Sequence, residues 1–187
     1  MPRFTVVVAD PEPRSAIRDA AAHASAALSR LVGPLAPGAA RGGTGARPGT
    51  DRTDVVDLAE LGPALLAARP GRDVVEAVET VRRSDVLLVA SPQAHGSYTG
   101  LLKVFLDRLP ELGLGHGVAV PMAVVDDLRN GRTIEDDLRV LLADLGAWVA
   151  EPGLLVSRRE LAEPRSVVGA WAEVAAPELG GALSVRV

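Results

Sequence analysis

The sequence lacks cysteine altogether, contains a single lysine and has few aromatic residues. The absence of cysteine excludes disulfide bonds, cysteine-ligated metals and thiol catalysis. Because only 3% of the residues are aromatic while 48% are hydrophobic, the core must be built mainly from valine, leucine and alanine. No apolar run is long enough to cross a membrane. A chain of 187 residues with this composition predicts one globular domain that needs no cross-links.

An excess of positive charge is also missing. The formal net charge is -4 at pH 7, which argues against nucleic acid as the main partner. The first residues do not resemble a signal peptide, so we expect a cytoplasmic protein that does not contact membranes. His23 and His116 lack the spacing of metal ligands, and no metal site is expected.

Short apolar runs alternate with helix-forming stretches along the whole chain. The runs predicted to be strands are residues 4–9, 53–58, 86–90, 118–125 and 154–156. The predicted helices cover 15–31, 74–83, 98–109, 133–145 and 160–176, with Ser15 and Thr133 as N-caps. Continuous apolar strands that alternate with helices indicate a parallel sheet covered on both faces. We therefore expect an α/β, flavodoxin-like three-layer sandwich whose five parallel strands have the order 2-1-3-4-5.

Residues 33–52 interrupt this alternation. They are rich in glycine, proline, alanine and arginine and show no periodicity. We interpret them as a flexible insertion within a single domain that covers residues 1–187.

In a sheet of this order, a ligand binds at the carboxyl ends of strands 1, 3 and 4. The loop after strand 1 leads into a helix whose free N–H groups and dipole suit an anion such as a phosphate, and Arg14, Ser15 and Arg18 are its candidate ligands. The loops after strands 3 and 4 supply the other candidate cofactor-binding residues, among them one aromatic side chain for a planar ring. These are Pro92, Gln93, Ala94, His95, Gly96, Ser97, Tyr98, Val124, Val125 and Asp126. Ser97 lies one place too early for the G-x-S-x-G nucleophile motif, so a hydrolase is not favoured.

The segment from Ser91 to Pro110 resembles the NAD(P)H-dependent FMN reductase family, and within it the branch that supplies reduced flavin to sulfonate monooxygenases. The positions that carry the resemblance are Ser91, Pro92, Gly96, Ser97, Tyr98, Thr99, Gly100, Leu101, Leu102, Lys103, Phe105, Leu106, Asp107, Leu109 and Pro110. Shorter similarities are Val56-Asp57-Leu58, Gly117-x-x-x-Pro121 and Leu138-Arg139-x-Leu141-Leu142.

This resemblance implies an oxidoreductase that binds FMN together with NADPH or NADH. Such enzymes pass a hydride from the nicotinamide to the flavin, and because the flavin carries the chemistry no acid–base pair is required. The resemblance also implies a homodimer or homotetramer, with a flavin-dependent monooxygenase as a partner.

The three loops differ from the usual family sequence, and this leaves a second interpretation open. The run 9–12, Ala-Asp-Pro-Glu, stands where the family usually has Gly-Ser-Pro-Arg, and Ala94 and His95 replace an aromatic and polar pair. Val125 and Asp126 occupy a position where glycines let the backbone approach the flavin, and we expect branched Val125 to obstruct that approach. The alternative is a family member that no longer binds flavin and acts as a ligand-binding or non-catalytic partner subunit.

Overall fold

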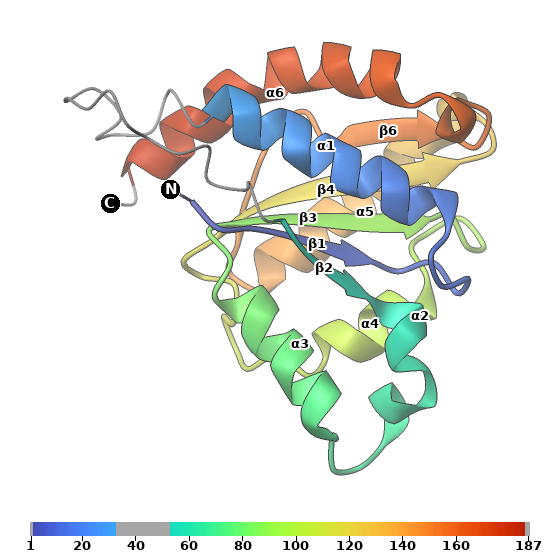
Figure 1. Cartoon of the computed structure of the whole chain (residues 1–187), viewed down its shortest axis with the longest axis vertical. Coiled ribbons are helices and arrows are strands. Elements are labelled where there is room, and N and C mark those ends of the chain that lie inside the picture. The colour runs from blue at the N-terminus through green and yellow to red at the C-terminus, as the bar shows by residue number, and fades with distance from the viewer. Residues whose placement is uncertain (1, 33–52, 186–187) are drawn as a thin grey trace, which may run out of the picture.

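The computed structural model describes residues 2–32 and 53–185. One six-stranded parallel sheet lies between two layers of helices (Figure 1). Its strands are β1 (Phe4–Val8), β2 (Asp54–Asp57), β3 (Val86–Pro92), β4 (Val118–Val125), β5 (Trp148–Val149) and β6 (Leu154–Ser157). The α-helices are α1 (Ala16–Val32), α2 (Leu58–Leu61), α3 (Arg72–Arg82), α4 (Gly100–Leu106), α5 (Gly131–Asp144) and α6 (Arg165–Val185). Short 3-10 helices are η2 (Gly62–Leu66), η3 (Leu128–Asn130) and η4 (Glu160–Ala162).

The strand order is β2-β1-β3-β4-β5, and every pairing is parallel. This confirms the predicted three-layer α/β fold. All residues of β1, β3 and β4 are buried, as their continuous apolar runs predict. The predicted insertion at 33–52 lies outside the described residues.

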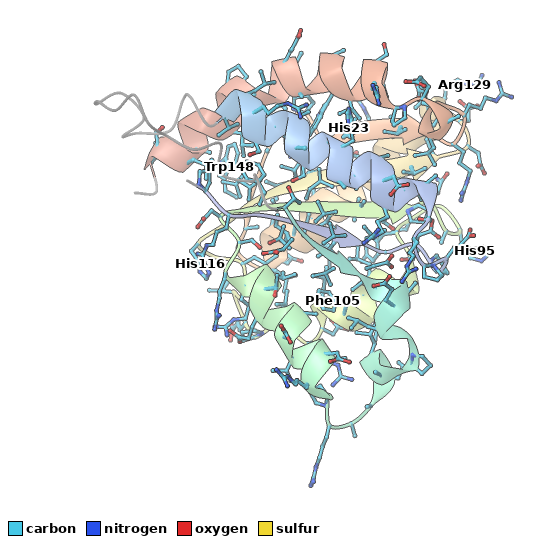
Figure 2. All side chains as sticks on the ribbon, viewed as in Figure 1. His23, His95, Phe105, His116, Arg129 and Trp148 are labelled. Atoms are coloured by element: carbon cyan, nitrogen blue, oxygen red, sulfur yellow. The ribbon has the colours of Figure 1, made fainter. Side chains whose placement is uncertain are left out.

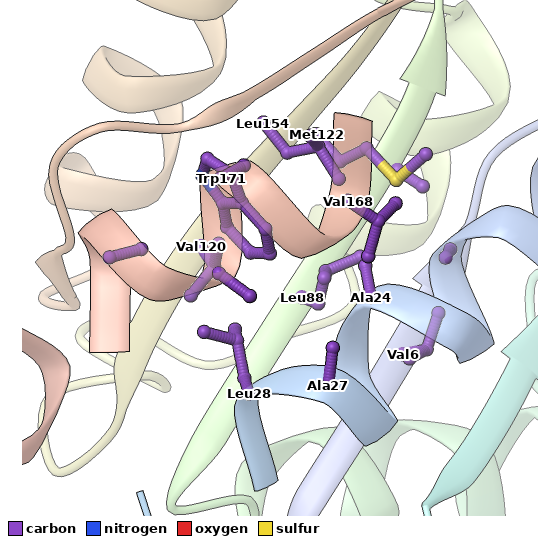
Figure 3. Close-up of a cluster of buried hydrophobic side chains, with 14 of the residues drawn as sticks. Val6, Ala24, Ala27, Leu28, Leu88, Val120, Met122, Leu154, Val168 and Trp171 are labelled. Carbon is purple, nitrogen blue, oxygen red and sulfur yellow. The ribbon is translucent and has the colours of Figure 1, made fainter. Parts of the chain in front are cut away.

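Alternate residues of the central strands feed two separate cores. Val6, Leu88 and Val120 point toward α1 and α6, where Ala24 and Trp171 pack against them (Figure 3). Their neighbours along the strands pack instead against α3, α4 and α5 on the opposite face. The small alanine side chains of α1 allow a close approach to the sheet and to α6, which is how so few aromatic residues suffice to fill the interior.

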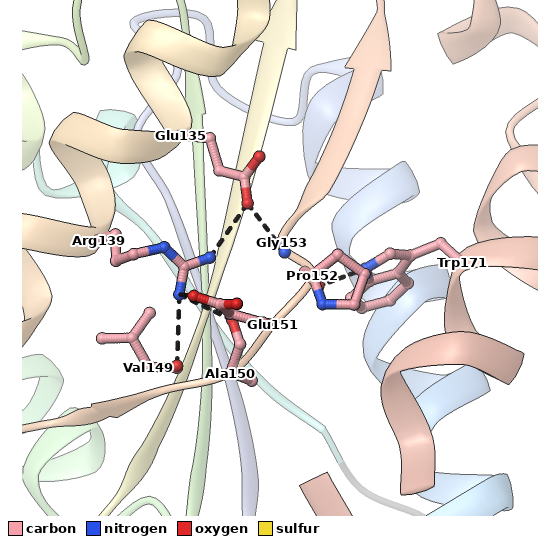
Figure 4. A network of polar contacts seen from close by, with 8 residues as sticks. All are labelled: Glu135, Arg139, Val149, Ala150, Glu151, Pro152, Gly153 and Trp171. Atoms are coloured by element: carbon pink, nitrogen blue, oxygen red, sulfur yellow. Dashed lines mark hydrogen bonds and ion pairs between the residues drawn. The ribbon is translucent and has the colours of Figure 1, made fainter. Parts of the chain in front are cut away.

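The fifth position of the sheet is divided between two strands, whereas the sequence predicted only one, near 154–156. Strand β5 pairs with the first residues of β4, and β6 pairs with its last four, Met122 to Val125. A polar network holds the connection between them (Figure 4). Arg139 donates to the carbonyl oxygens of Val149 at 3.4 Å and Ala150 at 3.3 Å, and Glu135 accepts from Gly153 N at 3.0 Å. A two-residue strand carries too weak a periodic signal to be recognised from sequence.

Several helix ends differ from the prediction. Helix α4 begins at Gly100 because Thr99 is its N-cap, and it ends at Leu106, so the predicted 98–109 was too long. Helix α5 begins at Gly131, so Thr133 lies inside the helix and is not its cap. Helix α6 continues to Val185 although Pro177 lies within it. The start of α5 was misplaced because Thr133 has the chemistry of a cap, and the end of α6 because proline is unfavourable inside a helix.

Candidate functional site

The carboxyl ends of β1, β3 and β4 meet at one edge of the sheet. Three segments follow them: the first loop (10–15), the second loop (93–99) and the third loop (126–129). Figure 2 shows His95 and Arg129 at this end of the molecule and His116 at the other end. Two backbone bonds join the strand ends directly, from Ala9 N to Ala90 O and from Gln93 N to Val124 O, each 2.8 Å long. The predicted site residues therefore come from neighbouring segments of one edge.

The first loop is shaped by a buried carboxylate that the sequence had not singled out. Arg14 has a left-handed backbone, with φ of 56°, and its N–H donates to Asp57 Oδ2 at 2.9 Å. The other oxygen of Asp57 accepts from Ala59 N at 3.1 Å, so Asp57 also caps α2. Its side chain is 1% exposed. Asp57 thus fixes the first loop against the end of β2.

Ser15 directly precedes the 17-residue helix α1, as predicted, but its hydroxyl does not cap the helix. The Ser15 Oγ atom is buried and has no hydrogen-bond partner in the part of the chain that the structure describes. Arg18 Nε is likewise buried without a hydrogen-bond partner, at 3.7 Å from Asp57 Oδ2. A buried polar group without a partner costs free energy, and an acceptor placed here would remove that cost. The amino end of α1 therefore has the donors and the helix dipole that an anion requires.

Most carboxylates around the first loop already have partners. Asp10 accepts from Glu12 N at 3.1 Å, and Glu60 accepts from Arg14 Nε at 3.2 Å. Asp57 is held by two backbone N–H groups, as described above. The arginines at this edge, Arg14 and Arg18, therefore form ion pairs with Glu60 and Asp57.

The second loop is a tight hairpin. Pro92 is the last residue of β3, and Ala94 and Ser97 exchange two backbone hydrogen bonds of 2.8 and 3.1 Å. The two residues between them have positive φ, 50° for His95 and 92° for Gly96. Positive φ at both central positions is what a type I′ turn requires. The hairpin exposes His95 and Gly96, while Tyr98 is half-buried and packs on the core beside α4.

Ser97 makes a hydrogen bond across the site. Its hydroxyl donates to Asp137 Oδ2 on α5 at 2.5 Å. The bond connects the second loop to the helix that follows β4.

The two aspartates of the third loop each form an ion pair with an arginine. Asp126 accepts from Arg158 Nε at 2.9 Å, and Asp127 accepts from Arg129 NH2 at 2.7 Å. The Arg129 side chain, helped by the Arg129 backbone N–H, holds the pKa of Asp127 below its usual value. Conversely, the bond to Asp127 raises the pKa of Arg129. Both aspartates therefore face the solvent with an arginine beside them.

Val124 and Val125 lie in β4 and are fully buried, one in each core. The expected obstruction by the Val125 side chain is therefore wrong, because this side chain packs into the protein interior. The carbonyl oxygens of both residues already accept hydrogen bonds, from Gln93 N and Arg158 N respectively. Any contribution of these two residues to a site at this edge would come from the backbone.

The family assignment follows from the sequence as a whole. The family model described as NADPH-dependent FMN reductase matches residues 2–160. The chain belongs to the NADPH-dependent FMN reductase family. It is accordingly an oxidoreductase, of a family whose description names FMN and a nicotinamide as cofactors.

Several solved structures resemble this family member in fold. An oxidoreductase from Corynebacterium diphtheriae is 25% identical, with a TM-score of 0.76 over 99% of this chain and 98% of that one. An NADH:FMN oxidoreductase in its apo form is 20% identical, with a TM-score of 0.70 over 94% and 90% of the two chains. RosB, solved with a flavin-phosphate intermediate, is 14% identical, with a TM-score of 0.64 over 98% and 80%. The last two show a shared fold alone, and no curated protein matches the sequence.

Whether FMN fits this site can be judged from the buried hydrogen-bond donors at the amino end of α1. Among the described residues, Ser15 Oγ and Arg18 Nε there have no hydrogen-bond partner, although Arg18 forms an ion pair with Asp57, and both are donors suited to a phosphate. The described residues contain no cluster of histidine and carboxylate side chains able to hold a metal ion. Nor does any described helix have the length and apolarity to span a membrane. The buried donors at the amino end of α1 thus fit the phosphate of a phosphorylated flavin.

Sequence reasoning missed Asp57, Asp137 and Arg158 as members of this edge. Asp57 could have been found, because it closes a predicted strand at the same edge as the first loop. Asp137 and Arg158 reach the site from α5 and from the residue after β6. Their roles depend on tertiary packing, and no local pattern indicates them.

Proposed function

We propose that this protein is an FMN reductase that transfers a hydride from NADPH or NADH to FMN bound at the carboxyl edge of β1, β3 and β4. The observation that carries the proposal is the unpartnered, buried hydroxyl of Ser15 at the amino end of α1. When bound there, FMN supplies the hydride-accepting ring. The chain's own residues bind and orient it.

Each loop has a distinct task in this proposal. Ser15, Arg18 and the first N–H groups of α1 hold the phosphate. The hairpin of the second loop, with Tyr98 beside it, borders the ring system, and the exposed faces of His95 and Gly96 leave room for a nicotinamide. The third loop borders the ring edge, where Arg158 and Arg129 offset the negative charge of Asp126 and Asp127 that would otherwise oppose the reduced, more anionic flavin.

We further propose that the reduced flavin is released to a flavin-dependent monooxygenase, in the manner of the sulfonate-linked branch. An open edge with two exposed hairpin residues is compatible with such exchange. A homodimer or homotetramer and a cytoplasmic location belong to the same proposal.

The proposal is tested by titrating the purified protein with FMN and following flavin fluorescence, then adding NADPH or NADH without oxygen. We expect saturable binding and bleaching of the flavin absorbance, faster than with free FMN. Riboflavin, which lacks the phosphate, is the matched control and should bind more weakly. If neither flavin binds, the reductase proposal is replaced by the alternative of a non-flavin partner subunit. The carboxylates of Asp10 and Glu12 would favour that outcome, because they repel a phosphate.

A further inference from the structure

Among residues 2–32 and 53–185, one side-chain hydrogen bond connects the tip of the second loop to the rest of the molecule. Gln93 and Thr99, at its two ends, are bonded to β4 and β1. Between them, among the hydrogen bonds of the described residues, only that from Ser97 to Asp137 joins the hairpin 94–97 to another element. The hairpin's position relative to α5 therefore depends on this bond.

Asp137 is well placed to hold the hairpin. It is half-buried on α5, between Ile134 and Leu138, which are fully buried against the sheet. The helix is therefore fixed to the core, while the carboxylate reaches the loop at 2.5 Å. A hydrogen bond to a charged acceptor is stronger than one between neutral groups, so the bond from Ser97 to Asp137 is a strong one.

We infer that Asp137 is a positioning residue that sets the second loop, through Ser97, at the distance from the flavin ring that hydride transfer requires. The inference rests on the proposed function. Hydride transfer depends steeply on geometry, since a misplacement of about 1 Å can cost on the order of 100-fold in rate. Asp137 acts through Ser97 and does not itself need to touch the flavin.

The test compares Asp137→Asn, Asp137→Ala and Ser97→Ala with Asp136→Ala, an exposed carboxylate on the same helix that serves as the control. We expect the first three to lower kcat by about 10-fold, with a smaller change in the KM for FMN, and Asp136→Ala to leave both unchanged. The Ser97→Ala/Asp137→Ala double variant should be no slower than either single variant, because both remove the same bond. Ser97→Thr keeps the hydroxyl and should restore most of the rate.

A second measurement does not need flavin. Hydrogen exchange of the Ala94 and Ser97 amides should quicken by about 10-fold in the Asp137 variants and stay unchanged in Asp136→Ala, with equal unfolding midpoints in urea. If the wild type fails to reduce FMN, the proposed function is wrong. The hydrogen-exchange result still shows whether Asp137 holds the hairpin in place. If the wild type is active and Asp137→Ala matches Asp136→Ala in both measurements, or if the Ser97 and Asp137 effects simply add, the inference is overturned.

Discussion

The hydroxyl of Thr99 donates a 2.8 Å hydrogen bond to the carbonyl oxygen of Ala9, joining the start of α4 to the end of β1. The Thr99 hydroxyl oxygen also caps α4 by accepting from Leu102 N at 3.4 Å. The backbone N–H of Thr99 donates to Ser91 Oγ at 3.1 Å. Thr99 thus holds the end of the second loop and the start of α4 against Ala9, the residue that precedes the first loop.

Replacing Thr99 by valine should therefore be costly although the shape is kept. Thr99→Val leaves the buried Ala9 carbonyl without its partner and removes the cap of α4, and we expect a loss of about 2–4 kcal/mol in the free energy of unfolding. Urea denaturation checks this. Thr80→Val is the control, because its hydroxyl bonds only to Glu76 O within α3 and its loss should change stability by less than about 0.5 kcal/mol.

Removal of the Ser15 hydroxyl should separate binding from stability. Because Ser15 Oγ has no hydrogen-bond partner among the described residues, Ser15→Ala should leave the unfolding free energy unchanged or slightly higher. It should weaken FMN binding by about 10-fold, through loss of a hydrogen bond to the charged phosphate. Binding of riboflavin is the internal control and should not change. An equal loss for both flavins would show that Ser15 does not contact the phosphate.

Val125→Gly distinguishes a core residue from a residue that obstructs a ligand. The side chain is 0% exposed, so the variant should lose about 2–4 kcal/mol of stability and gain no FMN affinity. Asp126→Asn, next to it but exposed, should unfold at nearly the wild-type urea concentration. A Val125→Gly variant that is both stable and tighter for FMN would contradict the placement of this residue.

The hairpin offers a stabilising substitution. His95 has φ of 50°, a conformation that asparagine tolerates better, and Asn-Gly is the preferred pair for such a turn. We expect His95→Asn to raise the unfolding free energy by up to about 1 kcal/mol. Gly96→Ala should lower it by about the same amount. No atom lies within 4 Å of the added carbon, so only the positive φ opposes the change. Thermal unfolding of the two variants should therefore shift in opposite directions.

The architecture could be predicted from sequence because its signals are local and strong. The valine-rich runs at 4–9, 86–90 and 118–125 are too apolar for a surface and too short for helices, so a buried parallel sheet was the remaining solution. Gly146 follows α5 closely, and its φ of 89° shows why a glycine is there. The strand at 148–149 was not predicted, because two residues are too few to show the alternation of a strand.

The candidate site was predictable only where it follows from chain order. The three loops had to meet, since they follow neighbouring parallel strands, but the partners of each side chain were beyond reach. Val125 and Asp126 are adjacent in sequence, yet one lies in the core and the other faces solvent with Arg158. Likewise, the bond from Ser97 to Asp137 spans 40 residues and leaves no trace in either local pattern.

The divided fifth position of the sheet has a consequence for how the molecule meets its neighbours. A long, straight outer strand presents a row of unpaired N–H and C=O groups on which another chain can add by β-pairing. Here that border is cut into pieces of two and four residues, and the other border, β2, is only four residues long. Arg139 and Glu135 fill the break with charged side chains. The break between β5 and β6 thus disfavours edge-to-edge aggregation of this valine-rich sheet.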